Sequence, residues 1–264
     1  MNFVSPSRTI KKAIANTISF LFEIDLEFSQ IPIEIGYPKY DAHYTSTIAL
    51  MIANRINLNP LQIAEAIAQN LITDAQWQIQ ALGKGWINIK LSDQYIAKSL
   101  LDLAQWQIEG LENHDGFWQR QAISMVSVNH SPEPILQYAY ARCCALIRLA
   151  NQENKNVAIH ELPLHSCFSD CLEPAETGLL MQNLAIAAYL ESLQGLDSED
   201  VLDSDQSRTK LSRSLAESFL DFYTHCRIFG VSRKIAIRRI LLIKITQKLL
   251  LAIAPSPINY AMYL

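Results

Sequence analysis

The stretch from Ile240 to Ala254, ILLIKITQKLLLAIA, constrains the fold more than any other part of the chain. Its apolar residues recur at helical spacing, and they are interrupted by Lys244 and Lys248, which lie four residues apart on one helix face. The run is too short and too charged to cross a membrane, so it predicts a core helix. The same periodicity recurs at roughly 136–150, 173–194, 207–228 and 231–253, which predicts an all-α bundle in the second half of the chain.

The first hundred residues combine helical and strand patterns. Helices are expected at 8–23, at two places within 44–71 and from Asp93 onward, with a strand at 31–38 and a hairpin at 77–92. Asn59 and Pro60 are typical of a helix start. We therefore expect an α+β domain at 1–105, a polar connector at 106–134 and a helical bundle at 135–264, mostly α overall.

Charge is distributed unevenly along the chain. The net charge is −4, which taken whole is not typical of a nucleic-acid-binding protein. The segment 206–264, however, holds ten lysines and arginines against two acidic residues, a net charge of +8. This clustering favours a surface that binds phosphate. The alternative is an ordinary solvated face, or a face that docks on the acidic loop 195–205.

The cysteine pattern indicates a reducing compartment. Five cysteines occur, an odd number with irregular spacing, and residues 1–16 lack the apolar stretch of a secretory leader, so we expect a cytoplasmic protein with reduced thiols. His160, His165, Cys167 and Cys171 lie close together in the sequence. No pair has the spacing of a zinc site, and we expect no metal and no cofactor.

One helix of the second half carries an unusual set of side chains. Within LQYAYAR lie Gln137, Tyr138, Tyr140 and Arg142. Aromatic rings stack on unpaired bases, and amide and guanidinium groups bind base edges or phosphates. The alternative is that the tyrosines are core residues and that the arginine holds a neighbouring helix. Tyr223 has the same two interpretations.

These motifs resemble those of arginyl-tRNA synthetases. The helix start at Asn59-Pro60 with IAE at 63–65, followed by GKGWIN at 83–88, is similar to the N-terminal additional domain of that family. LQYAYAR at 136–142 and the later pattern with Phe219, Phe222-Tyr223 and Cys226 are similar to the family's DALR anticodon-binding domain. The stretch DAHYT at 41–45 departs from the family's FGDYQ and keeps only Tyr44.

The family's catalytic domain would lie between these two domains, but the intervening segment is about 30 residues long, which is too short for it. No HIGH or KMSKS motif, P-loop or paired catalytic residues occur, so we expect no enzyme activity. The resemblance implies a non-catalytic protein that binds tRNA, of arginine type. Such a protein could act as an adaptor or chaperone for tRNA, or as a partner of a synthetase or modifying enzyme, without membrane contact. The alternative is a protein–protein interaction module that reuses this fold without RNA.

The resemblance and the charge together suggest the contact residues. Base contacts are expected from Gln137, Tyr138, Tyr140, Arg142, Tyr223 and Met262. Phosphate contacts are expected from Arg227, Arg233, Lys234, Arg238 and Arg239. In the first domain, Tyr44 is expected to face RNA.

Overall fold

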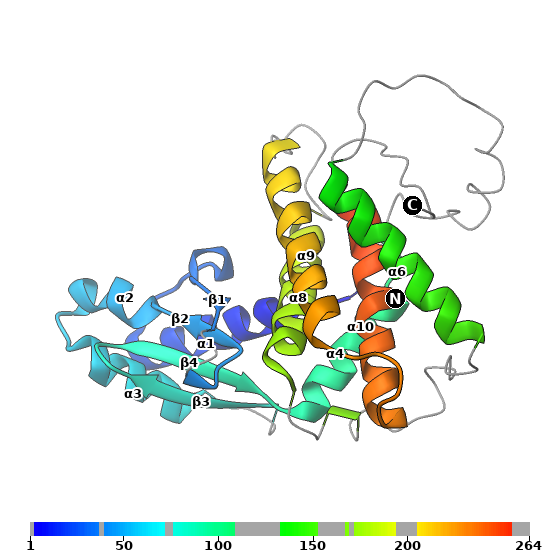
Figure 1. Ribbon diagram of the computed structural model, residues 1–264. Helices are drawn as coiled ribbons and strands as arrows, with labels where there is room; N and C mark the ends of the chain where they lie inside the picture. Colours follow the sequence, from blue (N-terminus) through cyan, green and yellow to red (C-terminus); the bar gives the residue numbers. More distant parts are fainter. Residues whose placement is uncertain are drawn as a thin grey trace. The chain divides into compact units, whose positions relative to one another are not determined.

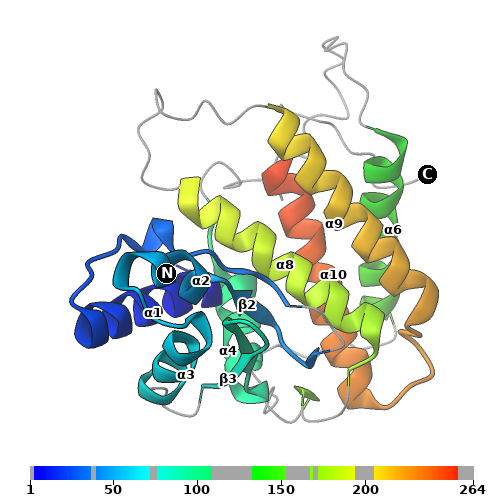
Figure 2. The same ribbon diagram turned by 90° about the vertical axis from the view of Figure 1, so that its left-hand side faces the viewer.

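The structure is a computed structural model that describes residues 3–36, 40–71, 76–108, 133–152, 167–168, 172–193 and 205–254. Its described residues fall into two compact units (Figures 1 and 2). Residues 4–99 form the N-terminal unit, and residues from Leu100 onward, together with Phe3, form the C-terminal unit. A small antiparallel sheet among helices comes first and a set of long helices follows, which confirms the predicted mostly α fold. Most of the expected connector lies outside the described residues.

The N-terminal unit is a four-stranded antiparallel sheet in the order β1-β2-β4-β3. Helices α2 and α3 pack against β4 and β3, and α1 packs against α3. The elements are α1 (Pro6–Phe22), the 3₁₀ turn η1 (Phe28–Gln30), β1 (Glu34–Ile35), β2 (Tyr44–Ser46), α2 (Ile48–Ile56), α3 (Pro60–Asn70), β3 (Trp77–Leu82) and β4 (Trp86–Leu91).

Local sequence signals set the helix starts in this unit. In α3 the Asn59 side chain accepts a hydrogen bond of 2.8 Å from the amide nitrogen of Leu61, and Pro60 occupies the first helical position, as predicted. In α1 the Ser5 side chain caps the helix in the same way. Isoleucines spaced four residues apart in α1 are then completely buried, and burial of each stabilises the unit by about 1.5–3 kcal/mol.

The β3–β4 hairpin turns at Gly83 and Gly85, which both adopt positive φ. A Cβ atom added at Gly85 would lie only 2.9 Å from the backbone of Pro60, so glycine lets the hairpin tip approach the start of α3. Alternation along β4 puts Ile87, Ile89 and Leu91 in the core. Trp86 and Asn88 therefore lie on the opposite face of the sheet.

Two details of the sequence prediction differ from the structure. The strand expected at 31–38 shortens to Glu34–Ile35. The segment Tyr44–Ser46, which was expected to begin a helix, is instead strand β2, hydrogen-bonded between β1 and β4, and α2 begins at Ile48. Pairing on both edges outweighs the helical periodicity that a single sequence shows at this point.

The C-terminal unit is a bundle whose long helices are α6 (Pro134–Gln152), α8 (Pro174–Leu193), α9 (Asp205–His225) and α10 (Arg233–Ile253). Helix α10 contacts the other three. It is buried on most of its surface, which agrees with the core helix predicted from its apolar run. Helix α4 (Asp93–Gln105) ends in this unit, where Lys248 of α10 donates hydrogen bonds to carbonyl oxygens of Leu103, Ala104 and Trp106. Among the described residues, no helix is long and apolar enough to cross a membrane.

Candidate nucleic-acid interface

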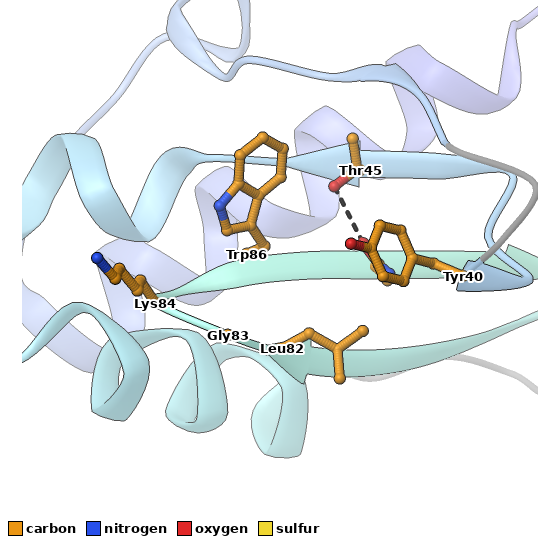
Figure 3. A pocket seen from close by; sticks show the side chains of 7 residues that line it. Tyr40, Thr45, Leu82, Gly83, Lys84 and Trp86 are labelled. Atoms are coloured by element: carbon orange, nitrogen blue, oxygen red, sulfur yellow. Dashed lines mark hydrogen bonds between the residues drawn. The ribbon is translucent and has the colours of Figure 1, made fainter.

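The N-terminal unit carries a recess of about 560 Å³ on the outer face of its sheet (Figure 3). Its walls come from β2, β4, the end of β3 and the hairpin tip, together with Tyr40, which lies a few residues before β2. The lining residues are Tyr40, Thr45, Leu82, Gly83, Lys84, Trp86 and Asn88. The rings of Trp86 and Tyr40 stand apart in the recess, and Lys84 lies at the end beyond Trp86.

The floor of the recess is polar and fixed. Thr45 and Asn88 are paired across β2 and β4, and both are buried. The Thr45 hydroxyl donates a hydrogen bond of 3.0 Å to Oδ1 of Asn88. Because both side chains belong to paired strands, the amide at the floor is held in one place while the rings above it remain accessible.

Exposure of the two rings is high for aromatic residues. Trp86 is 38% exposed and Tyr40 is 49% exposed. A flat ring beside a buried amide can hold a planar heterocycle, because the ring stacks on its face and the amide bonds its edge. The exposed ammonium group of Lys84 can reach a phosphate attached to such a group.

Tyr44, which was expected to face RNA, is buried. Burial raises the pKa of its hydroxyl, which has no hydrogen-bond partner among the described residues. Successive strand residues point to opposite faces, so Tyr44 points to the core and its neighbour Thr45 points to the recess. The residue of β2 that faces the recess is therefore Thr45 and not Tyr44. The sequence contained a signal for this face, because Trp86 and Asn88 alternate with the apolar Ile87 on the neighbouring strand.

The loop that carries Tyr40 is attached to β4 by side chains. The amide nitrogen of Leu91 donates a hydrogen bond of 2.9 Å to Nδ1 of His43, and Asp41 forms an ion pair with Lys90. Burial, and then the nearby positive charge of Lys90, lower the pKa of His43. The neutral imidazole therefore serves as the hydrogen-bond acceptor that ties β4 to the residue just before β2.

In the C-terminal unit, three of the predicted residues meet on α6 and α9. The guanidinium carbon of Arg142 lies 5.1 Å from the ring centre of Tyr138 and 5.7 Å from that of Tyr223. Nε of Arg142 also donates a hydrogen bond of 3.1 Å to the Tyr138 hydroxyl. Tyr223 in turn stacks on the buried ring of Phe219 at 6.3 Å. We call Tyr138, Arg142 and Tyr223 the aromatic cluster; all three are partly exposed.

Tyr140 does not belong to the aromatic cluster. It is 3% exposed, because two residues along a helix turn the side chain by about 200° and carry it into the core. This burial corrects the expectation that Tyr140 contacts bases. Gln137 is half-buried on the same helix, and Met262 lies outside the described residues.

Arg238 and Arg239 were expected at the surface, and the structure corrects this as well. They are 1% and 5% exposed, and both contact the completely buried carboxylate of Glu176. Nε and NH2 of Arg238 donate to Glu176 at 2.6 and 3.0 Å, and NH2 of Arg239 donates at 3.2 Å. Both guanidinium groups are therefore bonded to a core carboxylate and shielded from solvent, so they are not available to phosphate.

Three other predicted cations remain on the surface. Arg227, Arg233 and Lys234 are exposed, just before α10 and in its first turn. The Ser232 side chain caps this helix start. Positive side chains and the free amide groups at the start of a helix both attract anions.

The described residues contain no group of three histidines, cysteines or acids that could hold a metal ion. Of the residues considered for a metal, His160, His165 and Cys171 lie outside the described residues, and Cys167 is buried. Burial raises the pKa of Cys143, which is typical of an unreactive core thiol.

Comparison with protein families gives two matches in sequence order. Residues 8–91 match the arginyl tRNA synthetase N terminal domain, and residues 136–253 match the DALR anticodon binding domain. No catalytic-domain family is found beside them.

Curated relatives include several arginine–tRNA ligases. That of Listeria monocytogenes serotype 4a is 27% identical over 82% of this chain, and that of Mesoplasma florum is 40% identical over 24% of it. The ligase of Methanopyrus kandleri is 33% identical over 32% of this chain. The chain spans only 12 to 38% of the length of these three relatives. In sequence order, the chain thus matches the N-terminal domain of arginyl-tRNA synthetases and then the DALR anticodon binding domain, and it is similar to parts of arginine–tRNA ligases.

Proposed function

We propose that this chain is a non-catalytic, cytoplasmic RNA-binding protein whose ligand is tRNA, of arginine type. It would present or protect tRNA as an adaptor or chaperone, or act beside a synthetase or a tRNA-modifying enzyme. The observation that carries the proposal is the recess of the N-terminal unit, where two exposed rings flank a buried amide. This combination suits an unstacked base, because the rings can stack on its faces and the amide can bond its edge.

The C-terminal unit supports the same proposal independently. Its aromatic cluster offers two partly exposed rings and a guanidinium group, and exposed cations lie at the start of α10. Rings suit the bases of a single-stranded loop, and cations suit its phosphates. Bases would be held by Trp86 and Tyr40 in one unit and by Tyr138 and Tyr223 in the other. Phosphates would be held by Lys84, Arg227, Arg233 and Lys234.

Fluorescence anisotropy with an arginine-type tRNA transcript tests the proposal. Trp86→Ala should weaken binding about tenfold, since stacking on one ring contributes about 1–3 kcal/mol. Phe20→Ala is the matched control, because this ring is 81% exposed on α1 and does not line the recess. The proposal fails if wild type does not bind tRNA, or if the two variants bind equally well.

Salt dependence tests the phosphate contacts. Replacing Arg233 and Lys234 together by alanine should reduce the slope of log affinity against log salt by roughly one for each contact. The same change should weaken binding to every tRNA alike, because phosphate contacts carry no sequence information. An unchanged slope would remove these two residues from the interface.

The non-catalytic part of the proposal has its own test. ATP–pyrophosphate exchange with arginine should stay at background, with or without tRNA, and exchange above background would overturn it. The competing proposal is a protein–protein interaction module, motivated by the net charge of −12 outside segment 206–264. Stoichiometric recovery of one protein after RNase treatment, without tRNA binding, would favour that module.

A further inference from the structure

The aromatic cluster is closed by one of its own members. Arg142 of α6 lies over the ring of Tyr138, one turn earlier on its own helix, and over the ring of Tyr223 on α9. Tyr223 is already covered on one side by the buried Phe219. A base that stacks on the face of either ring covered by the guanidinium group must therefore displace that group.

Few interactions hold Arg142 in this position. Among the described residues, it makes one hydrogen bond, to the Tyr138 hydroxyl, and no carboxylate pairs with it. A cation–π contact at an exposed site changes an equilibrium by only about two- to fivefold. Stacking of a base on a ring changes it by about fivefold to 150-fold. Arg142 makes two cation–π contacts and one hydrogen bond, so the stacking of a single base only offsets what is lost. Exchange of the guanidinium for a base becomes favourable when the displaced cation finds a new partner.

A phosphate group is the partner that a guanidinium prefers. It accepts two parallel N–H bonds from arginine, and these charge-assisted bonds are stronger than a bond to a tyrosine hydroxyl. We propose that Arg142 is a displaceable cover of the two tyrosine rings, and that a backbone phosphate of the incoming strand draws it away. The aromatic cluster then selects phosphate-bearing single strands over uncharged bases. This inference rests on the proposed function, and it assigns Arg142 a role other than reading a base edge.

The sign of two mutational effects tests the inference. The probes are labelled (dT)6 with natural phosphodiester linkages and labelled (dT)6 with uncharged methylphosphonate linkages, measured by anisotropy at low salt. All proteins carry Trp86→Ala, so that the recess of the N-terminal unit contributes less, and contributes equally in every comparison. Arg142→Ala should weaken binding of the natural strand severalfold, because a phosphate contact is lost. The same substitution should strengthen binding of the uncharged strand about two- to fivefold, because the rings are uncovered.

Two further variants separate the possible outcomes. Arg148→Ala removes the same charge from α6 and should leave binding of the uncharged strand unchanged. Tyr223→Ala should weaken binding of both strands. If Arg142→Ala weakens both strands, or changes neither, the covering role is wrong while the proposed function stands. If the protein with an intact aromatic cluster and the Tyr223→Ala variant bind the natural strand equally, the proposed base site in this unit fails as well.

Discussion

Replacement of Glu176 by glutamine should destabilise the C-terminal unit more than almost any other single isosteric change. The side chain keeps its shape but loses its charge, and its new N–H groups face guanidinium donors. Arg238 and Arg239 are then left buried without a counter-charge. Breaking a buried ion pair in this way costs about 3–5 kcal/mol. Against a total stability of about 5–15 kcal/mol, this is a large fraction.

Urea denaturation followed by circular dichroism at 222 nm, which mainly reports the helices of the bundle, measures this loss. With a slope of about 2 kcal/mol per molar urea, the midpoint should fall by about 2 M. Glu217→Gln, an exposed position on α9, should change the free energy of unfolding by less than about 0.5 kcal/mol. Replacing all three residues by methionine (Glu176→Met, Arg238→Met and Arg239→Met) should recover most of the loss, because neither a charge nor an amide side chain is then left buried without a partner. A loss below about 1 kcal/mol in the single variant would refute the reasoning.

Three further predictions concern the stability of the two units. Because the folded-state pKa of His43 is lowered from 6.5, the hydrogen bond that its neutral ring accepts should stabilise the N-terminal unit above pH 6.5 and be lost as the pH falls below it. His43→Asn, which keeps an acceptor near Nδ1, should flatten the urea midpoint between pH 5 and 8, and an unaltered pH profile would contradict this. Gly85→Ala should lower the free energy of unfolding by about 2 kcal/mol or more, because the new methyl group meets Pro60. Gly83→Ala, at positive φ but in open space, should lower it by about 1 kcal/mol. Equal losses for the two variants would argue against the close approach of Gly85 to Pro60. Lys248→Met should cost about 1–3 kcal/mol in thermal or urea unfolding, because carbonyl oxygens at the end of α4 lose their donor, and no loss would mean that water replaces it.

Local signals predicted much of the fold. The cap at Asn59 and Pro60 and the glycine turn of the hairpin act through residues that are neighbours in the sequence, so a single sequence reveals them. Strand β2 could not be predicted in this way, because its partners in β4 lie more than forty residues away. Its sequence also satisfies a helical pattern.

The candidate site was predicted less well for a similar reason. Counting charges cannot distinguish Arg233, which is exposed, from Arg238, whose partner Glu176 lies on another helix. Similarly, Tyr44 and Thr45 are neighbours in β2 and point to opposite faces of the sheet, so that only Thr45 faces the recess. Tyr138, Arg142 and Tyr223 lie together and partly exposed on helices that the sequence pattern already indicated, and their contact with bases stays a prediction.

The buried carboxylate of Glu176 also has a consequence during synthesis on the ribosome. Its partner Arg238 follows it by 62 residues, so a nascent chain exposes α8 well before the guanidinium groups emerge. Until then, packing α8 into the bundle would bury the negative charge of Glu176 without a partner. The free energy is therefore lower while the helix stays in contact with water. We therefore expect the bundle to close only after α10 has emerged. In a chain terminated ahead of α10, the remaining helices of the C-terminal unit should stay unfolded and should become a substrate for proteolysis.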